Sequence, residues 1–418
     1  MIRVCDAIMG TGKTSATITY LNEHKNEKFI YITPYLTEAS RIKEGCPDLH
    51  FVEPSNKLKK YDFKKSLHTA ALISQGRNIA TTHQAFKGYT GEVLKDIQEK
   101  GYTLIVDENV DVLEKYDIHP GDLQMTIDAG YVSEHNSEYS ITGKQYSGIA
   151  MREMFRLLQS RKLIRINDEK ENDLFFWTLP PDLITSFKDV FILTYLFDGQ
   201  SLHHLLTIYG LQYENIGIER TEQGEYRFGS YPGYVPEYVK NLKNMLHIVE
   251  NDRLNAVGDQ KYSLSINWFD RNDDGVEQLK RNVWNFFNCI NKDIPANRRL
   301  WGTYASKYGV VKGKGYTKSF ITFNTKATNE YKDRTHLVYI ANIFMNVNEK
   351  SFYQMHGIEV NEDAYALSIM VQWIWRSAIR DGSEVYLYIP SKRMRDILTR
   401  WIEITSKGGE ANDCQRLQ

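Results

Sequence analysis

Short apolar runs that alternate with longer amphipathic stretches dominate the first half of the chain. Four of these runs have the length and apolar character of buried strands, namely residues 2–5, 28–34, 103–106 and 190–197. Helix-prone stretches at 15–22 and 36–44 follow the first two runs. Strands that alternate with helices are typical of α/β folds with a parallel sheet, so this pattern predicts an α/β domain.

The alternation is interrupted between residues 111 and 189, where polar loops surround a helical run at 148–160. A hairpin is expected in the same region, with 163–166 paired to 174–177. We interpret this region as an α+β insertion into a first domain at 1–212.

A second run of predicted strands and helices begins at 262–269 and includes strands near 319–323 and 336–340. We therefore expect a second domain at 213–418.

A glycine-containing loop lies between the first strand and the first helix. Its expected nucleotide-binding residues are Ala7, Gly10, Thr11, Gly12, Lys13 and Thr14. Glycines let the backbone N–H groups approach phosphates, and the following helix start carries partial positive charge. Lys13 would reach the β- and γ-phosphates and Thr14 a magnesium ion. The alternative is an accidental glycine-rich turn.

Two carboxylates, Asp107 and Glu108, directly follow the strand at 103–106. In ATPases this arrangement holds magnesium with the first acid and orients the attacking water with the second. Acidic pairs after apolar runs are common, but here the pair follows Lys13 and Thr14 in the expected order. The combination predicts ATP binding and hydrolysis with Mg²⁺.

Polar residues also end two other predicted strands. Thr33 and Pro34 close one strand, and Thr82, His83 and Gln84 lie where another passes into a helix. Ligands bind at the carboxyl edge of open α/β sheets, so these residues are candidates for nucleic-acid contacts. The alternative for His83 is a helix-capping role.

The segment 298–318 interleaves basic and aromatic residues in a glycine-rich stretch. Lys312, Lys314 and Lys318 are its candidate phosphate contacts, with rings available for bases. A solvated basic loop is the alternative. Thr328 and Asn329, after the strand near 319–323, are further candidates for nucleic-acid contact.

A helix beginning near Asp363 is expected to carry Gln372, Arg376 and Arg380 on one face, since they stand at i, i+4 and i+8. Flanking tryptophans indicate a packed helix, so exposed arginines on it would need an anionic partner such as the γ-phosphate. A solvated cationic stripe is the alternative.

Composition narrows the classes of protein. The 418 residues are 42% hydrophobic and 25% charged, with net charge −1 and four scattered cysteines, which fits a globular chain with reduced thiols and no structural zinc. No apolar run approaches the roughly 20 residues that span a bilayer. The loop at residue 7 leaves no room for a signal peptide, so we expect a cytoplasmic protein without a membrane partner.

Taken together, the motifs resemble those of the superfamily 2 (DEAD/DEAH-like) helicases and translocases over almost the whole chain. The phosphate loop is similar to that family's first motif, the residues after the second strand to its strand-binding motif, 81–84 to the next, and Asp107-Glu108 to its acidic motif. The stretch 193–195 is similar to the third motif and 372–380 to the sixth, while 325–333 fits the fifth loosely. Tyr195, Trp375 and Ile379 stand where the family has smaller residues, so coupling of ATP to movement is expected to be looser.

The resemblance implies two RecA-like P-loop domains that hydrolyse ATP with Mg²⁺, with Lys13, Glu108, Gln372, Arg376 and Arg380 as catalytic residues. Implied partners are single-stranded or forked DNA, with RNA as an alternative, and replication or recombination proteins. The compact size resembles bacteriophage or mobile-element helicases, which would place the chain in the host cytoplasm. The sequence does not define the oligomeric state, and a monomer is the preferred expectation. A terminase-like packaging motor and a nucleic-acid-binding scaffold with a slow ATP switch remain as alternative functions.

Overall fold

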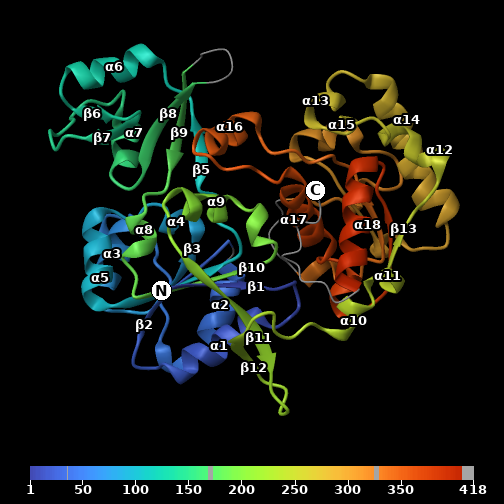
Figure 1. Cartoon of the computed structure of the whole chain (residues 1–418), viewed down its shortest axis with the longest axis horizontal. Helices are drawn as coiled ribbons and strands as arrows, with labels where there is room; N and C mark the ends of the chain where they lie inside the picture. The colour runs from blue at the N-terminus through green and yellow to red at the C-terminus, as the bar shows by residue number, and fades with distance from the viewer. Residues whose placement is uncertain (35, 168–172, 324–328, 407–418) are drawn as a thin grey trace. The chain divides into compact units, whose positions relative to one another are not determined.

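The computed structural model describes residues 1–34, 36–167, 173–323 and 329–406, and the chain divides into two compact units (Figure 1). The first unit comprises residues 1–7, 12–233 and 346–360. The second comprises residues 8–11, 234–345 and the chain from residue 361. Each unit has its own parallel sheet, so each is described separately.

A seven-stranded sheet forms the first unit, in the order β12-β11-β1-β10-β4-β2-β3. All neighbours are parallel except β12, which pairs antiparallel with β11. The strands are β1 (Ile2–Asp6), β2 (Lys28–Thr33), β3 (Ile79–Thr82), β4 (Tyr102–Asp107), β10 (Asp189–Thr194), β11 (Tyr213–Arg220) and β12 (Tyr226–Ser230). The boundary expected at residue 212 falls directly before β11, which pairs with β1.

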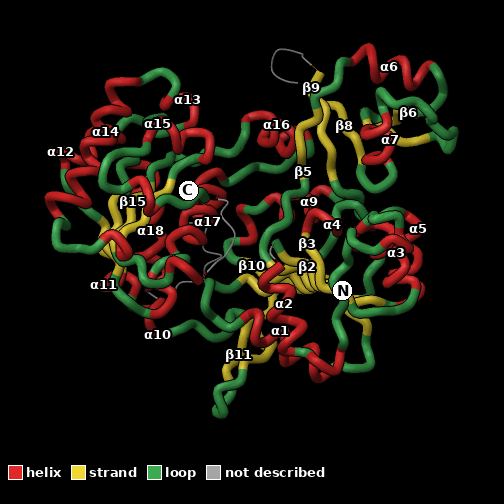
Figure 2. The backbone as a smooth tube through the Cα atoms, turned by 180° about the vertical axis from the view of Figure 1, so that it is seen from behind, coloured by secondary structure: helices red, strands yellow, loops and turns green. Residues whose placement is uncertain are grey.

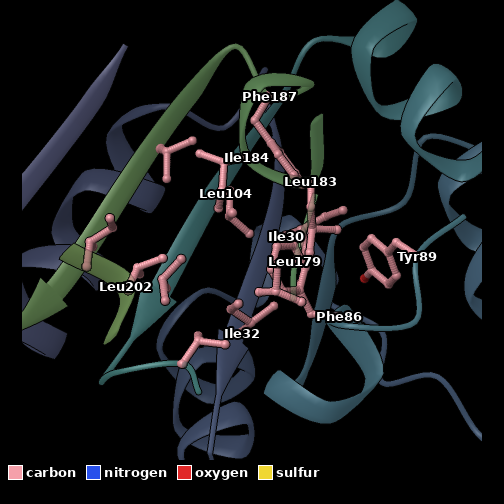
Figure 3. Packing of buried hydrophobic residues seen from close by; sticks show 14 of the residues in the cluster. Ile30, Ile32, Phe86, Tyr89, Leu104, Leu179, Leu183, Ile184, Phe187 and Leu202 are labelled. Carbon is pink, nitrogen blue, oxygen red and sulfur yellow. The ribbon is translucent and has the colours of Figure 1, made fainter. Parts of the chain in front are cut away.

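Both faces of this sheet are covered, which explains why its strands read as continuous apolar runs. Alternate residues of β2 enter different cores: Ile30 and Ile32 pack in one, and Phe29 and Tyr31 in the other. Figure 3 shows the first of these cores. The helices that pack on that face are α3 (Lys65–Ser74), α5 (Gly91–Lys100), α8 (Asp182–Thr185) and α9 (Ser201–Ile208), while α1 (Lys13–Glu23) and α2 (Leu36–Gly45) cover the other.

The predicted insertion is a separate antiparallel layer of the first unit, in the order β5-β9-β8-β7-β6. Its elements are β5 (Leu113–Tyr116), α6 (Pro120–Asp128), β6 (Val132–His135), β7 (Glu138–Ile141), α7 (Arg152–Leu158), β8 (Lys162–Asn167) and β9 (Asp173–Thr178). The expected hairpin is confirmed, with Ile164 opposite Phe176. Helix α16 (Val347–Met355), from much later in the chain, belongs to this unit, and its Phe352 ring lies 6.1 Å from that of Phe176.

The second unit is built on a four-stranded parallel sheet in the order β13-β16-β15-β14 (Figure 2). The strands are β13 (Leu246–Ile248), β14 (Arg299–Gly302), β15 (His336–Tyr339) and β16 (Val385–Tyr388). Its helices are α10 (Glu237–Lys240), α11 (Leu242–Met245), α12 (Asp252–Asn255), α13 (Ile266–Phe269), α14 (Asp273–Asn285), α15 (Tyr308–Val311), α17 (Glu362–Ile374) and α18 (Lys392–Ser406).

Two strands expected in the second unit are absent from its described residues. At 262–269 the chain instead makes a turn and enters helix α13 at Ile266, and Leu264 in the turn has a left-handed φ of 65°, which a regular strand does not accommodate. Near 319–323, Phe320 makes only an isolated bridge with Trp301 after a 3₁₀ turn. The strand expected at 336–340 is confirmed as β15.

The predicted fold class is confirmed: two RecA-like α/β domains with parallel sheets flanked by helices, and an α+β insertion in the first. Within the described ranges, none of the helices has the length and hydropathy required to cross a membrane.

Candidate functional site

The loop between β1 and α1 has the backbone that a phosphate cradle requires. Gly10 and Gly12 have φ values of 86° and 94°, a region that glycine adopts readily and other residues rarely. Gly12 is the N-cap of α1 and contributes no capping side chain, so the first amides of the helix are not capped by a side chain. Amides arranged in this way bind phosphate oxygens.

Lys13 lies in the first turn of α1 and donates from Nζ to the Ala7 carbonyl, which brings its side chain back over the loop. Desolvation is the main cause that lowers its pKa, while Cys5 and the carboxylates Asp107, Asp6 and Glu108 act in the opposite direction. A desolvated ammonium interacts more strongly with phosphate than one in water, because the local dielectric is lower.

Gly12 is also constrained by its surroundings. A Cβ atom at this position would lie 2.3 Å from Cδ1 of Tyr226, on β12. The hairpin of β11 and β12 therefore packs directly against the phosphate loop, and only glycine fits at residue 12.

The strand order places the acidic pair beside this loop. β10 lies between β1 and β4, and the register aligns Asp6 with Thr194 and Leu193 with Asp107. Neighbouring strands are about 4.8 Å apart, so the ends of β1 and β4 are separated by roughly 10 Å. That spacing suits a phosphate chain and one metal ion.

Asp107 is buried and accepts a hydrogen bond of 2.6 Å from the Tyr31 hydroxyl. Burial raises its pKa to about 6, although the bond from Tyr31 opposes the shift. Glu108 follows with a left-handed φ of 63°, and its N–H donates to the Leu193 carbonyl at 2.9 Å. Such backbone strain in a non-glycine residue often accompanies a functional site.

Asp6, which our sequence reasoning missed, is the last residue of β1 and is buried. Its carboxylate accepts hydrogen bonds from the amides of Leu196 (2.8 Å) and Phe197 (3.0 Å). Burial raises its pKa to about 6 despite these two bonds. The sequence signal that marks Asp6 is its position, as an acidic residue between an apolar run and the glycine-containing loop.

The candidates on β2 and β3 come together as expected, since Thr33 and Thr82 are directly paired. Thr82 caps helix α4 (His83–Phe86), and Gln84 is exposed. The His83 Nε2 atom bonds to the Asp107 carbonyl at 2.8 Å, and burial lowers its pKa to about 4. Because a carbonyl only accepts, Nε2 carries the proton, and the neutral ring connects α4 to the acidic strand.

The expectation that Gln372, Arg376 and Arg380 share one helix face is wrong, because α17 ends at Ile374. Ser377 ends the helix by donating both its N–H and its hydroxyl to the Ile374 carbonyl, at 3.0 and 2.6 Å. Arg376 Nη1 then bonds to the Phe323 carbonyl at 3.0 Å, while Arg380 is exposed in a 3₁₀ turn. The tryptophans are buried, as the sequence indicated.

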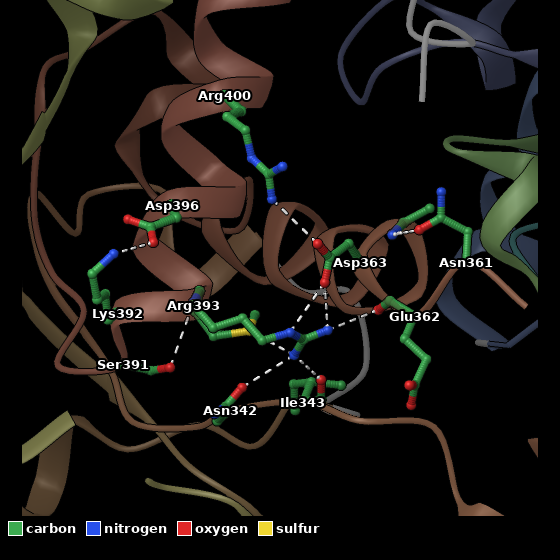
Figure 4. Close-up of polar contacts among 12 residues, drawn as sticks. Asn342, Ile343, Asn361, Glu362, Asp363, Ser391, Lys392, Arg393, Asp396 and Arg400 are labelled. Carbon is green, nitrogen blue, oxygen red and sulfur yellow. Dashed lines mark hydrogen bonds and ion pairs between the residues drawn. The ribbon is translucent and has the colours of Figure 1, made fainter. Parts of the chain in front are cut away.

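The carboxyl edge of the second sheet is occupied by a network centred on Arg393 (Figure 4). Its guanidinium contacts Asp363 Oδ1 at 2.7 Å, the Ile343 carbonyl at 2.6 Å and Asn342 Oδ1 at 3.1 Å. Asn342 in turn donates to the Lys261 and Ser263 carbonyls. These polar groups hold α17, α18 and the segment after β15 together.

The basic and aromatic segment at 298–318 is only partly what the sequence predicted. Trp301 and Tyr316 are core residues rather than exposed rings, since they pack with the other side chains of the second unit's core. Lys312, Lys314 and Lys318 are exposed. Thr328 and the side chain of Asn329 lie outside the described residues, so these candidates stay predictions.

The residues in the first unit fit magnesium and a nucleoside triphosphate. Thr14 lies in the first turn of α1, and Asp107 has a buried carboxylate with one oxygen bound to Tyr31. These are hard oxygen donors of the kind that Mg²⁺ prefers. Among the described residues, this site included, no group of three or more His, Cys, Asp or Glu residues is suited to a metal ion, so the magnesium fit rests on the Thr14 hydroxyl and the Asp107 carboxylate.

Comparison with known proteins gives one whole-length relative. The chain is 37% identical to the SPbeta prophage-derived uncharacterized protein YonV of Bacillus subtilis (strain 168), over 96% of this chain and 98% of that protein. Residues 240–402 match the family model described as the YonV C-terminal Rossmann-like domain.

Solved structures with a similar arrangement are more distant. The structure named XPD helicase is 9% identical with a TM-score of 0.44, covering 98% of this chain and 95% of its own. The structure named XPD apo is 11% identical with a TM-score of 0.46, covering 96% and 95%.

Proposed function

The chain belongs to the family of the prophage protein YonV, and from that premise we propose that it is a nucleic-acid-dependent ATPase of the helicase or translocase type. The observation that carries the proposal is the register of β1, β10 and β4. It brings the phosphate loop and the pair Asp107-Glu108 to one edge of one sheet.

The proposed division of labour follows from each group's chemistry. The amides after Gly10 and Gly12, with the Lys13 ammonium, would bind the β- and γ-phosphates. Thr14 and Asp107 would hold Mg²⁺, which when bound supplies positive charge against the phosphate oxygens. Glu108 would accept a hydrogen bond from the attacking water and orient it toward the γ-phosphorus.

Three further roles belong to the proposal. Thr33, Thr82 and Gln84, at the carboxyl ends of β2 and β3, would contact one nucleic-acid strand. Arg376 and Arg380 would supply cationic charge to the γ-phosphate during hydrolysis, with Gln372 beside them in sequence. The work done would be movement along DNA during phage replication or recombination.

Steady-state phosphate release with and without single-stranded DNA, single-stranded RNA and duplex DNA tests the proposal. We expect ATP turnover that requires Mg²⁺ and rises at least severalfold with a single strand. Lys13→Ala serves as the background control, because it removes the phosphate-binding ammonium. Turnover equal to that control under every condition would exclude an ATPase.

The same experiment separates the alternatives. A terminase-like motor would respond to duplex DNA in preference to single strands. A binding scaffold with an ATP switch would bind nucleotide and strand but release phosphate slowly with either. A helicase would in addition separate a forked duplex in an ATP-dependent manner.

A further inference from the structure

A lysine-rich loop in the first unit, at residues 57–65, presents an unusually concentrated positive surface. It contains five lysines and one acid, Asp62, within nine residues. Lys57, Lys59, Lys60 and Lys64 are exposed, and Lys65 is partly exposed. Among the described residues, none of the five forms an ion pair with a carboxylate. We refer to it below as the lysine loop.

The loop has a defined conformation that is anchored from beneath. The Tyr61 ring stacks on His68 of α3 with ring centroids 4.7 Å apart, and His68 Nδ1 accepts from the Ser55 amide at 3.0 Å. Backbone bonds from Asp62 to Lys59 (3.0 Å) and from Lys64 to Tyr61 (2.8 Å) close the turn.

An apolar ring projects from this turn. Phe63 is 59% exposed, and it follows Asp62 with both residues in the left-handed region, at φ values of 55° and 51°. Because the Phe63 side chain is mostly exposed, it contributes little to the core of the protein. Beside lysines, it has the chemistry of a platform for a nucleic-acid base.

The topology places the lysine loop at the carboxyl edge of the sheet. Val52 pairs parallel with Ile79 at the start of β3, so the chain from residue 52 runs toward that edge. Helix α3 then returns from Lys65 to Ser74 and leads into the start of β3. A helix of ten residues spans about 15 Å and the strand about 13 Å, so the Lys65 end of α3 lies near the end that carries Thr82.

We propose that the lysine loop binds the phosphates of a single-stranded nucleic acid and that Phe63 stacks on one of its bases. The proposal rests on the proposed function, because it names the surface that would hold that enzyme's polymer. The positive end of α3, which begins at Lys65 without a side-chain cap, adds to the attraction.

The test is the variant Lys59→Gln, Lys60→Gln, Lys64→Gln in the full chain, with a fluorescent oligo(dT) or oligo(U) as probe and no nucleotide. A single strand contributes roughly 0.7 unit of salt slope per phosphate contact, so the slope of log affinity against log salt should fall by about two units. Affinity near 0.1 M salt should fall by about tenfold or more. The matched control neutralises the exposed lysines Lys25, Lys43 and Lys95 of the same unit and should leave the slope unchanged.

Phe63→Ala separates stacking from charge. It should lower affinity by about 5- to 150-fold, equivalent to roughly 1–3 kcal/mol per stacked base, with an unchanged salt slope. Thermal melting of each variant should match the wild type, because these side chains are exposed. Oligo(dT) and oligo(U) together define whether the strand is DNA or RNA.

An unchanged salt slope in the triple variant would overturn the proposal. The same variant is also tested for binding to anionic lipid vesicles, and a loss of vesicle binding without any loss of oligonucleotide binding would likewise overturn it. Phosphate release measured without nucleic acid tests the ATPase independently of strand binding by the lysine loop. If the wild type binds strands through the lysine loop but never hydrolyses ATP, only the ATPase fails. If hydrolysis is normal and the slope is retained, only the lysine loop fails.

Discussion

The polar side chains at the carboxyl edges of the two parallel sheets differ in how far they are satisfied by contacts within the chain. In the first unit, Asp6 and Asp107 are buried carboxylates without a salt-bridge partner among the described residues, beside an uncapped helix start and Lys13. In the second, Asn342 and Arg393 are bonded to backbone carbonyls and to Asp363. The second edge is satisfied by its own chain, whereas the first has charge that a ligand can balance. The two edges therefore differ in whether their polar groups are satisfied within the chain.

The largest expected effect tests the first edge directly. Lys13→Ala should abolish ATP hydrolysis, and Glu108→Gln should cut phosphate release by about 10³-fold or more while ATP stays bound, since the amide cannot orient water as a base. Phosphate release and nucleotide affinity measured on both variants check this. Wild-type turnover in either one would contradict the assignment of the first edge.

Substitution of Arg376 and Arg380 tests whether the second unit contributes positive charge to ATP hydrolysis. If they act on the γ-phosphate, Arg376→Ala and Arg380→Ala should cut strand-stimulated hydrolysis by about 10²-fold or more with ATP binding nearly intact. Arg281→Ala, on the exposed face of α14, is the control. A parallel loss of melting temperature, binding and turnover would instead mark them as structural, a role for which Arg376 already has bonds to two backbone carbonyls.

The second edge should prove structural when Arg393 is changed. Arg393→Gln removes the main partner of the Ile343 carbonyl and of Asp363, which keeps Arg400, and the free energy of unfolding should fall by about 2 kcal/mol. Lys392→Gln is the matched control, because its pair with Asp396 is exposed and should be worth less than about 1 kcal/mol. Denaturant titration of both variants measures the difference, and equal losses would contradict the comparison.

Asp6 makes the first edge sensitive to pH. Its pKa is raised from 3.8 to about 6 in the folded chain, so protonation favours folding. The stabilisation is complete below about pH 4 and is lost as pH rises through about 6. Relative to Asp6→Asn, the wild type should therefore lose about 2–3 kcal/mol of unfolding free energy between pH 4 and 7.5. Urea titrations across that range check it, and a constant difference would refute the carboxylate as the source.

The smallest effect concerns the exposed lysines of the second unit. Neutralising Lys312, Lys314 and Lys318 should lower the salt slope of strand binding by about two units if they contact phosphates. Of the rings in this segment, Trp301 and Tyr316 are buried and Tyr304 and Tyr308 partly buried, and none is changed in this variant, so no loss of base stacking should accompany the change in slope. An unchanged slope would identify them as solvated surface and leave strand binding to the first unit.

Periodicity and motif order predicted most of the first unit. Strands β1, β2, β3, β4 and β10, the phosphate loop and the acidic pair follow from local sequence, because buried strands and glycine loops carry strong local signals. The order of strands in the sheet was not predictable in the same way. The pairing of β1 with both β10 and β11 depends on contacts about 190 to 210 residues apart.

The second unit was harder to predict, for identifiable reasons. Helix α17 ends at Ile374, where the carbonyl accepts both the N–H and the hydroxyl of Ser377, and a helical repeat of arginines does not reveal this. Trp301 and Tyr316 look like a binding surface in the sequence, yet packing places them in the core. The role of Asp6 could not be predicted from local sequence, because its carboxylate accepts hydrogen bonds from the amides of Leu196 and Phe197, nearly 200 residues away.

Helix α16 has a consequence for dividing the protein. The first unit is discontinuous in sequence, since residues 346–360 return to it after more than a hundred residues of the second. There, Phe352 and Tyr353 pack beside Phe176 and His204. A truncation at residue 233 would strip this cover from the insertion and from α9, and such a fragment should be prone to aggregate. Adding residues 346–360 as a separate peptide, or splicing them onto the truncated chain, should restore a soluble first unit.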